Sequence, residues 1–221
     1  VDTDQASFSI NDLSVDESAG TATLTVSLDQ PADSTVTVDF ATMNQSAVNA
    51  TDYQTTSGTL TFSPNEVSKT ITIPIIDSDQ VELDESFLVQ LTDIQSGGLD
   101  IVFADSQAEV TIIDDDRASL SIADVSVNEG AGTVELTVSL DKPDETLFTV
   151  DYISSNGSAH SSTDYQHSTG TLTFNPEVTS QKIIIPIIDS DLVTPLRTLN
   201  SGLRADTHAG DVQIFRRVFV H

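Results

Sequence analysis

The sequence predicts an all-β protein, an immunoglobulin-like antiparallel β-sandwich in two tandem copies of which the second is incomplete. The main observation is a repeat: residues 7–79 align without a gap with residues 119–191, and 42 of the 73 aligned pairs are identical. The second observation is that apolar residues alternate with Ser and Thr in nearly every segment. This period of two gives a strand one apolar and one polar face, and no long stretch has helical spacing.

The alternating segments follow one another through the first copy. They are rich in Val and Thr, which suit a half-buried pleated surface. Turn residues such as Gly, Pro, Asn and Asp separate them. About seven short strands in roughly 110 residues is typical of an immunoglobulin-like sandwich. We expect a first strand ending at Glu17, followed by strands over 22–28, 36–40, 60–62, 71–75, 86–91 and 108–113.

The second copy stops resembling the first after Asp191. Four of the eight Lys and Arg residues lie in the last 25 positions, so the composition also changes there. We therefore expect a complete sandwich over 1–116, a partial one over 117–193 that lacks its last two strands, and a non-homologous, foreign or out-of-frame tail over 194–221. In the alternative interpretation, the tail is a natural variation and Val212–Val220 supplies a replacement strand. A sandwich without two strands exposes unpaired edges, so we also expect a homodimer formed through the second copy.

Composition limits the classes of partner. The formal net charge of −27 disfavours nucleic acids and anionic lipids, which would be repelled. There is no apolar run of about 20 residues, so we expect no membrane insertion. The absence of cysteine rules out disulfides and thiolate chemistry. We expect a segment of a larger extracellular or cell-surface protein, of bacterial origin.

Acidic residues gather where the predicted strands end, and several of them recur in both copies. Loops at one end of a sandwich converge, so carboxylates from distant segments can meet. Such carboxylates repel one another unless a cation neutralises them. Ca²⁺ fits best because it accepts six to eight oxygen ligands in flexible geometry, whereas Mg²⁺ is stricter and Zn²⁺ prefers Cys and His. The alternative is that single Asp residues only form turns, as we expect for Asp29, Asp33, Asp84, Asp93 and Asp105.

The motifs V-D-E-S-A-G, A-T-D-Y, I-P-I-I-D-S-D-Q-V-E-L-D-E-S-F and V-T-I-I-D-D-D resemble the Calx-β domain, over all of 6–116 and part of 117–193. That family includes domains of sodium–calcium exchangers, of an integrin β subunit and of bacterial extracellular proteins. The resemblance implies Ca²⁺ at one end of the sandwich. Its ligands in the first copy would be Glu17, Asp52, Asp77, Asp79, Glu82, Glu85, Asp114, Asp115 and Asp116, with the carbonyl of Gln80. Ser78 stands where domains that bind several ions have another Asp, so we expect fewer ions or weaker binding. The second copy would hold a weak or empty site of Glu129, Asp164, Asp189 and Asp191.

The function expected from these observations is non-enzymatic: Ca²⁺ binding that rigidifies the loops and the interdomain junction of an adhesive or structural protein. A carbohydrate- or ligand-binding module with structural Ca²⁺ is the alternative, although the low aromatic content of 5% argues against sugar-stacking platforms. A hydrolase using Glu82 and Glu85 is a remote third. No nucleophile elbow, zinc-binding helix, P-loop or dinucleotide motif is present. The protein or glycan partner is not identified by the sequence.

Overall fold

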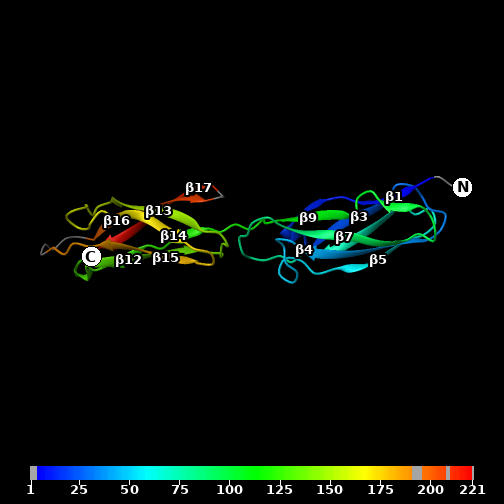
Figure 1. Cartoon of the computed structure of the whole chain (residues 1–221). Helices are drawn as coiled ribbons and strands as arrows, with labels where there is room; N and C mark the ends of the chain where they lie inside the picture. The colour runs from blue at the N-terminus through cyan, green and yellow to red at the C-terminus, as the bar shows by residue number, and fades with distance from the viewer. Residues whose placement is uncertain (1–3, 191–195, 208–209, 221) are drawn as a thin grey trace. The chain divides into compact units, whose positions relative to one another are not determined.

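The computed structural model describes residues 4–190, 196–207 and 210–220, with side chains as far as residue 202 (Figure 1). The chain divides into two compact units. The first comprises 1–78 and 83–115, and the second comprises 79–82 and 116–221. The described residues contain strands and two short 3-10 turns but no α-helix. The prediction of an all-β chain with two tandem sandwiches is therefore confirmed. Among the described residues, no helix could cross a membrane.

The first unit consists of two sheets that face each other. One sheet has the strand order β6-β3-β1-β8 and the other the order β2-β9-β7-β4-β5. Their strands are β1 (Ala6–Ile10), β2 (Leu13–Asp16), β3 (Thr21–Leu28), β4 (Val36–Asn44), β5 (Ser57–Phe62), β6 (Ser68–Pro74), β7 (Glu85–Gln95), β8 (Ile101–Phe103) and β9 (Gln107–Ile113).

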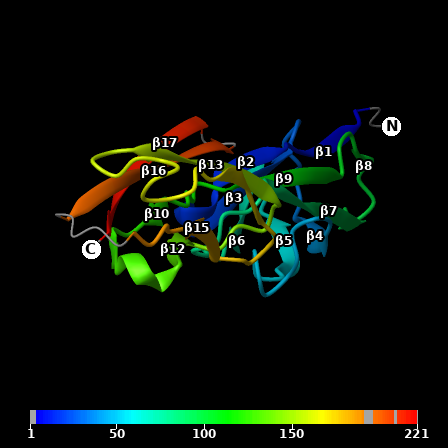
Figure 2. The ribbon, with the colours of Figure 1, turned by 90° about the vertical axis from the view of Figure 1, so that its left-hand side faces the viewer.

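The first predicted strand is split between the two sheets. β1 pairs in parallel with β8, beside which it lies in Figure 2. After a two-residue break, β2 pairs in parallel with β9 in the other sheet. The remaining pairs of this unit are antiparallel. The split places the residues that follow β2 beside those that follow β9, at one end of the sandwich.

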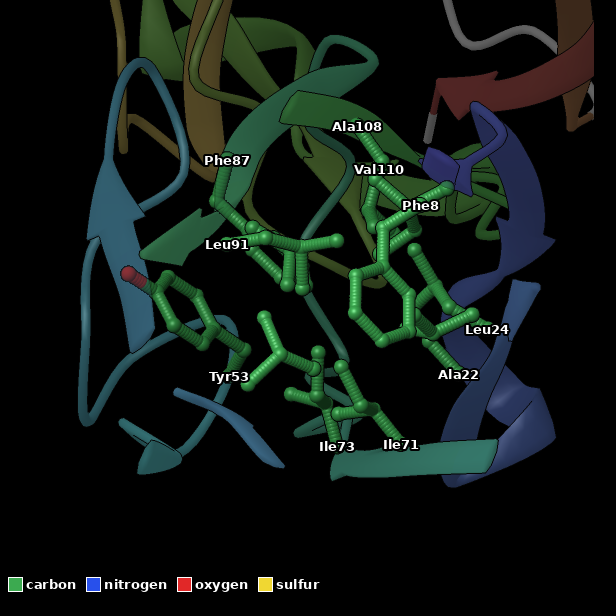
Figure 3. Packing of buried hydrophobic residues seen from close by; sticks show 14 of the residues in the cluster. Phe8, Ala22, Leu24, Tyr53, Ile71, Ile73, Phe87, Leu91, Ala108 and Val110 are labelled. Carbon is green, nitrogen blue, oxygen red and sulfur yellow. The ribbon is translucent and has the colours of Figure 1, made fainter. Parts of the chain in front are cut away.

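The core of the first unit follows the alternation in the sequence. In β3, every second residue from Ala22 to Leu28 is buried. Figure 3 shows Phe8, Ile71, Ile73 and other side chains of both sheets converging on this core. Tyr53 lies at its edge, stacked on Phe87 with ring centroids 4.0 Å apart. The Tyr53 hydroxyl points away from the cluster and donates a hydrogen bond to Asn44 Oδ1 at 2.6 Å. Burial of this tyrosine raises the pKa of its hydroxyl.

The second unit repeats this plan around a core of its own. One sheet has the order β10-β12-β15 and the other the order β11-β17-β16-β13-β14. Its strands are β10 (Leu120–Ile122), β11 (Val125–Val127), β12 (Thr133–Leu140), β13 (Phe148–Asn156), β14 (Thr169–Phe174), β15 (Ser180–Pro186), β16 (Arg197–Thr207) and β17 (Gly210–Val220). In the part of this unit that the structure describes, no strand corresponds to β8.

The structure differs from the expectation that the second sandwich lacks its last two strands. β16 and β17 form a hairpin and complete the five-stranded sheet, and β11 pairs in parallel with β17 as β2 does with β9. The physical reason is that a strand needs a buried face, not an identical sequence. Leu199 and Ser201 are both buried against β13 although the repeat is no longer recognisable there. A homodimer was expected because two strands seemed to be missing. With these strands present, that reason for expecting a homodimer no longer applies.

Candidate metal centre

Glu17 is a buried acid at the start of a short turn. The turn η1 (Glu17–Ala19) follows β2 directly, and Gly20 closes it with a φ of 72°, which only glycine adopts without steric cost. Glu17 is only 5% exposed. Its Oε1 accepts a hydrogen bond from the backbone N–H of Ser78 at 2.8 Å. The Ile75 N–H also donates to the Gly20 carbonyl, at 3.0 Å. The turn is thus fixed to the loop after β6.

Two exposed acids complete a cluster around Glu17. Asp77 lies in the loop after β6, and Asp115 follows β9. The sheet registers bring them together, because β6 ends beside the start of β3 and β9 ends beside Asp16. One carboxylate oxygen from each of Glu17, Asp77 and Asp115 lies within 4.8 Å of the other two. The sequence predicted all three of these residues as ligands.

A hydroxyl that the sequence did not single out orients one member of the cluster. Ser18 Oγ donates a hydrogen bond to Asp115 Oδ2 at 2.7 Å. Ser18 directly follows Glu17 in the turn η1. This turn therefore presents the carboxylate of Glu17 and also holds the carboxylate of Asp115. The position 112 residues later is Gly130, which has no hydroxyl. A comparison of the two copies at this position is therefore the signal that could have identified Ser18.

The cluster fits a calcium ion by its donor set and its dimensions. Three negative groups this close repel one another, and a divalent cation between them removes the repulsion. Oxygen ligands lie 2.3–2.6 Å from Ca²⁺, so two oxygens on one ion can be up to about 5 Å apart. The 4.8 Å limit of the cluster falls within this range. Hydrogen bonds from the Ser78 N–H and the Ser18 hydroxyl hold the carboxylates of Glu17 and Asp115 in place.

Asp52 lies outside the cluster and stabilises a turn. Its Oδ2 accepts a hydrogen bond from the Val48 N–H at 2.5 Å, and its carbonyl accepts one from the Ile76 N–H at 2.9 Å. This is the turn-forming role that the sequence analysis considered for single Asp residues. Asp84 differs, because its Oδ1 accepts the Asp114 N–H at 3.3 Å and so links two segments 30 residues apart instead of forming a turn. Glu85 is a half-buried residue at the start of β7 and, like Asp114, is not part of the cluster.

Four other predicted ligands belong to the second compact unit: Asp79, Gln80, Glu82 and Asp116. Within that unit, Lys142 Nζ donates to Asp79 Oδ1 at 3.2 Å and to Asp116 Oδ1 at 2.6 Å. These hydrogen bonds, first that to Asp116, raise the pKa of Lys142. The side-chain amide of Gln80 donates to Glu177 at 2.6 Å. Lys142 was not predicted, because its only signal in the sequence is its place in a D-K-P turn.

The second unit retains only part of the arrangement. Glu129 Oε1 accepts the Ser190 N–H at 3.1 Å, as Glu17 does that of Ser78. Asp189 lies near this turn, its Oδ2 being 3.8 Å from where a Cβ on Gly130 would stand. Asp191 is outside the described residues. Among those residues, no three acids of this unit come as close as the three of the first.

Asp164 of the second unit has a basic partner. Its Oδ2 accepts the His160 N–H at 2.7 Å, and its Oδ1 accepts a hydrogen bond from the guanidinium of Arg197. Asp164 is 6% exposed, so the charges form a largely buried ion pair. Sequence reasoning missed Arg197 because the repeat was taken to stop at Asp191. Extending the same offset through the tail would have placed Arg197 at the position of Glu85.

The chain matches the Calx-beta domain twice, over residues 2–116 and 117–214. The second match continues past residue 193, the predicted end of the partial sandwich. Among curated relatives, sodium/calcium exchanger 2 of Homo sapiens is 32% identical over 175 residues, which are 72% of this chain and 19% of the exchanger. Sodium/calcium exchanger 1 of Felis catus is 31% identical over 196 residues, which are 79% of this chain and 20% of that protein. The chain thus spans about a fifth of the length of these relatives.

Two solved structures are also similar. CBD12 from CALX1.2 aligns over 91% of this chain and 82% of its own, with 23% identity and a TM-score of 0.47. The calcium binding domain CBD12 of CALX1.1 aligns over 90% of this chain and 79% of its own, with 23% identity and a TM-score of 0.45.

The relatives correct one prediction. An extracellular or cell-surface location in a bacterium was expected, but the curated relatives are sodium/calcium exchangers of mammals. That expectation is wrong, because neither the composition nor the family resemblance reports location. The resemblance seen in the motifs is confirmed, because the family matches both copies. The chain belongs to the Calx-beta domain family.

Proposed function

We propose that this chain is a calcium-binding regulatory module of a larger protein and that its first unit holds the ion at Glu17, Asp77 and Asp115. The observation that supports the proposal is the convergence of these three carboxylates in a member of the Calx-beta family. They come from three loops that are remote in sequence, and hydrogen bonds hold two of them in place. This convergence is more than turn formation requires.

Further ligands are needed, because calcium takes six to eight oxygens. We propose Asp52, Glu85 and Asp114 of the same unit as candidates that approach when the loops close around the ion. Asp52 can contribute Oδ1, since its Oδ2 is used by the turn. The predicted roles of Asp79, Gln80, Glu82 and Asp116 stay predictions.

The ion would act by ordering the loops that carry its ligands. A ligand that binds only the ordered arrangement stabilises it by mass action, by about 2.7 kcal/mol at a concentration 100 times its Kd. Asp115 is the last residue of the first unit, so ordering it also restricts the backbone that leads into the second. This is a regulatory effect of binding, and it requires no catalysis. Nothing in the described site favours a carbohydrate ligand or a hydrolase, so we propose no second function.

Isothermal titration calorimetry of the full chain with CaCl₂ tests the proposal, with MgCl₂ as the competing ion. The variants Asp77→Asn and Asp115→Asn should each weaken calcium binding by at least about tenfold, because each removes a charged ligand. Asp33→Asn is the matched control: it removes one exposed acid of the same unit outside the cluster and should leave binding unchanged. Unchanged calcium binding in both site variants would overturn the assignment of the site.

A further inference from the structure

Arg197 occupies the position in the second unit that Glu85 occupies in the first. The strand registers establish this, because Asn156 of β13 lies opposite Leu199 of β16, and Asn44 of β4 lies opposite Phe87 of β7. Leu199 and Phe87 are thus equivalent. Leu199 lies two residues after Arg197, and Phe87 lies two residues after Glu85.

Hydrogen bonds around the strand start confirm the equivalence. In the second unit the Ala159 N–H donates to the Thr198 carbonyl at 2.8 Å, and the Thr198 N–H donates to Ser158 Oγ at 2.7 Å. In the first unit, Ala47 and Ser46 make the same two bonds with Ser86, both at 2.8 Å. The residue before Ser86 is Glu85, and the residue before Thr198 is Arg197. An acid predicted to bind calcium has therefore been replaced by a base.

The base meets an acid that both copies share. Asp52 and Asp164 each use Oδ2 to cap their turn, accepting the N–H of Val48 and of His160 respectively. In the second unit the other oxygen, Oδ1, is bound by the Arg197 guanidinium. Asp164 is buried, and a desolvated carboxylate needs a cation or another strong partner to stay charged.

The start of β16 is held so that Arg197 stays in place. The backbone of Thr198 passes so close to Gly157 that a Cβ on Gly157 would be 2.3 Å from the Thr198 carbonyl oxygen. Only glycine permits this approach. The equivalent residue of the first unit is Gln45, so the contact is particular to the second unit.

We infer that Arg197 is the built-in cation of the second unit. It makes the order of the loop at 159–166, which carries Asp164, independent of calcium. Among the described residues, the acids of this unit's predicted site do not fit a metal ion, because a guanidinium holds Asp164, and Glu129 and Asp189 form no three-acid cluster with it. The arginine supplies fixed positive charge, so the loop at 159–166 is ordered at any calcium concentration. This extends the proposed function, with one unit responsive and the other constitutive.

Hydrogen–deuterium exchange of the full chain tests this, read on peptides covering 159–166 in chelator and in CaCl₂. In chelator, Arg197→Gln should speed exchange of this segment by about tenfold, because it leaves a buried carboxylate without its partner. Arg197→Lys should stay near wild type. The double variant Arg197→Gln with Asp164→Asn should recover much of the protection, since it removes both charges. Lys182→Gln, which breaks the exposed Lys182–Glu135 pair of the same unit, is the matched control and should have no effect on 159–166.

Calcium should leave exchange of 159–166 in the wild type unchanged within about twofold, which corresponds to less than 0.5 kcal/mol. Slowing of this segment by calcium as strong as that around Asp77 would overturn the inference. So would an Arg197→Gln variant that exchanges like wild type in chelator. If calcium protects neither unit, the proposed function fails, and the chelator comparison alone decides the role of Arg197. If Arg197→Gln does not fold, the double variant decides: recovery of folding supports the pairing, and continued failure contradicts it.

Discussion

The carboxylate of Glu17 accepts a hydrogen bond from the backbone N–H of Ser78 at 2.8 Å, across 61 residues of sequence. The same bond recurs between Glu129 and the Ser190 N–H in the second unit. An acid, buried in the first unit and half-buried in the second, thus ties the turn after one strand to the loop after another in both copies. In the first unit this contact holds the Glu17 carboxylate within the three-acid cluster.

Glu17→Gln should weaken calcium binding strongly but destabilise the calcium-free protein little. Glutamine keeps an acceptor for the Ser78 N–H, but it removes one of the three negative charges that meet within 4.8 Å. We expect a loss of affinity of at least about tenfold. Calorimetry measures the affinity, and melting in chelator measures the stability. A variant that melts far below wild type in chelator would show that the glutamate is structural.

Ser18→Ala should weaken calcium binding by roughly two- to tenfold, the range expected for one hydrogen bond. The hydroxyl does not need to touch the ion, since it orients Asp115 through a 2.7 Å hydrogen bond. Calorimetric titration measures the change. Ser18→Thr, which retains the hydroxyl, should bind more tightly than the alanine variant. Equal affinities for the two variants would contradict an orienting role.

Asp29→Asn should reduce stability at neutral pH and have little effect in acid. The carboxylate accepts the Ser7 N–H at 2.6 Å and the Ser7 hydroxyl at 2.9 Å, and these bonds, first that to the backbone, lower the pKa of Asp29 from 3.8. A lowered pKa in the folded state gives stability that is present above the ordinary value and is lost as the pH falls through the lowered one. Urea unfolding at pH 7 and below pH 3 measures the difference in the free energy of unfolding between wild type and variant. A difference that does not change with pH would show that the charge of Asp29 does not contribute to stability.

Gly157→Ala should destabilise the second unit by about 1–3 kcal/mol, the typical cost of overpacking. The added Cβ would stand 2.3 Å from a backbone oxygen of Thr198, which cannot move as a flexible side chain does. Gln45→Ala at the equivalent position of the first unit is the control and should cost much less. Urea unfolding, followed by exchange protection of each unit, separates the two effects. Equal losses would mean that β16 does not pass this loop closely.

Leu199→Ala should destabilise the second unit by about 2–5 kcal/mol, as for other large-to-small core substitutions. Leu199 is 0% exposed and lies opposite Asn156 in the completed sheet. Denaturant unfolding measures the loss of stability. The control is Asn200→Ala at the half-buried residue next to Leu199, and it should have a smaller effect. If residues 194–221 were a foreign tail that does not pack, neither variant would alter the second unit.

The sequence predicts the sandwich well, because strand alternation and the repeat both reflect burial. Positions such as Leu24 and Ile73 are buried where the period of two places them. The split of the first strand was not predictable, since β1 and β2 share the same alternation of apolar and polar residues and are separated only by Asn11 and Asp12. Which sheet a short segment joins depends on partners far along the chain.

The candidate site was predicted only in part. The acids shared by the two copies include Glu17 and Asp77, and the D-D-D triplet includes Asp115. Sheet registers bring these three strand-end carboxylates together, and their role as calcium ligands stays a prediction. Spacing could not distinguish these from Asp52, whose carboxylate caps a turn. The base that faces Asp164 was missed as well, because identity between the copies is lost before Arg197, although the offset of 112 residues and the strand register continue.

The parallel pairing of β2 with β9 has a mechanical consequence. β2 is the second strand of the first unit and β9 is its last, and they run in the same direction from Leu13 beside Val110 to Asp16 beside Ile113. Tension applied across the unit pulls their outer ends in opposite directions along the strand axis. The ladder is then loaded in shear, and its bonds must yield together rather than open one at a time like a zipper. Any ion held by Asp115 sits just beyond the last rung, where it would add to the force that this unit withstands before rupture.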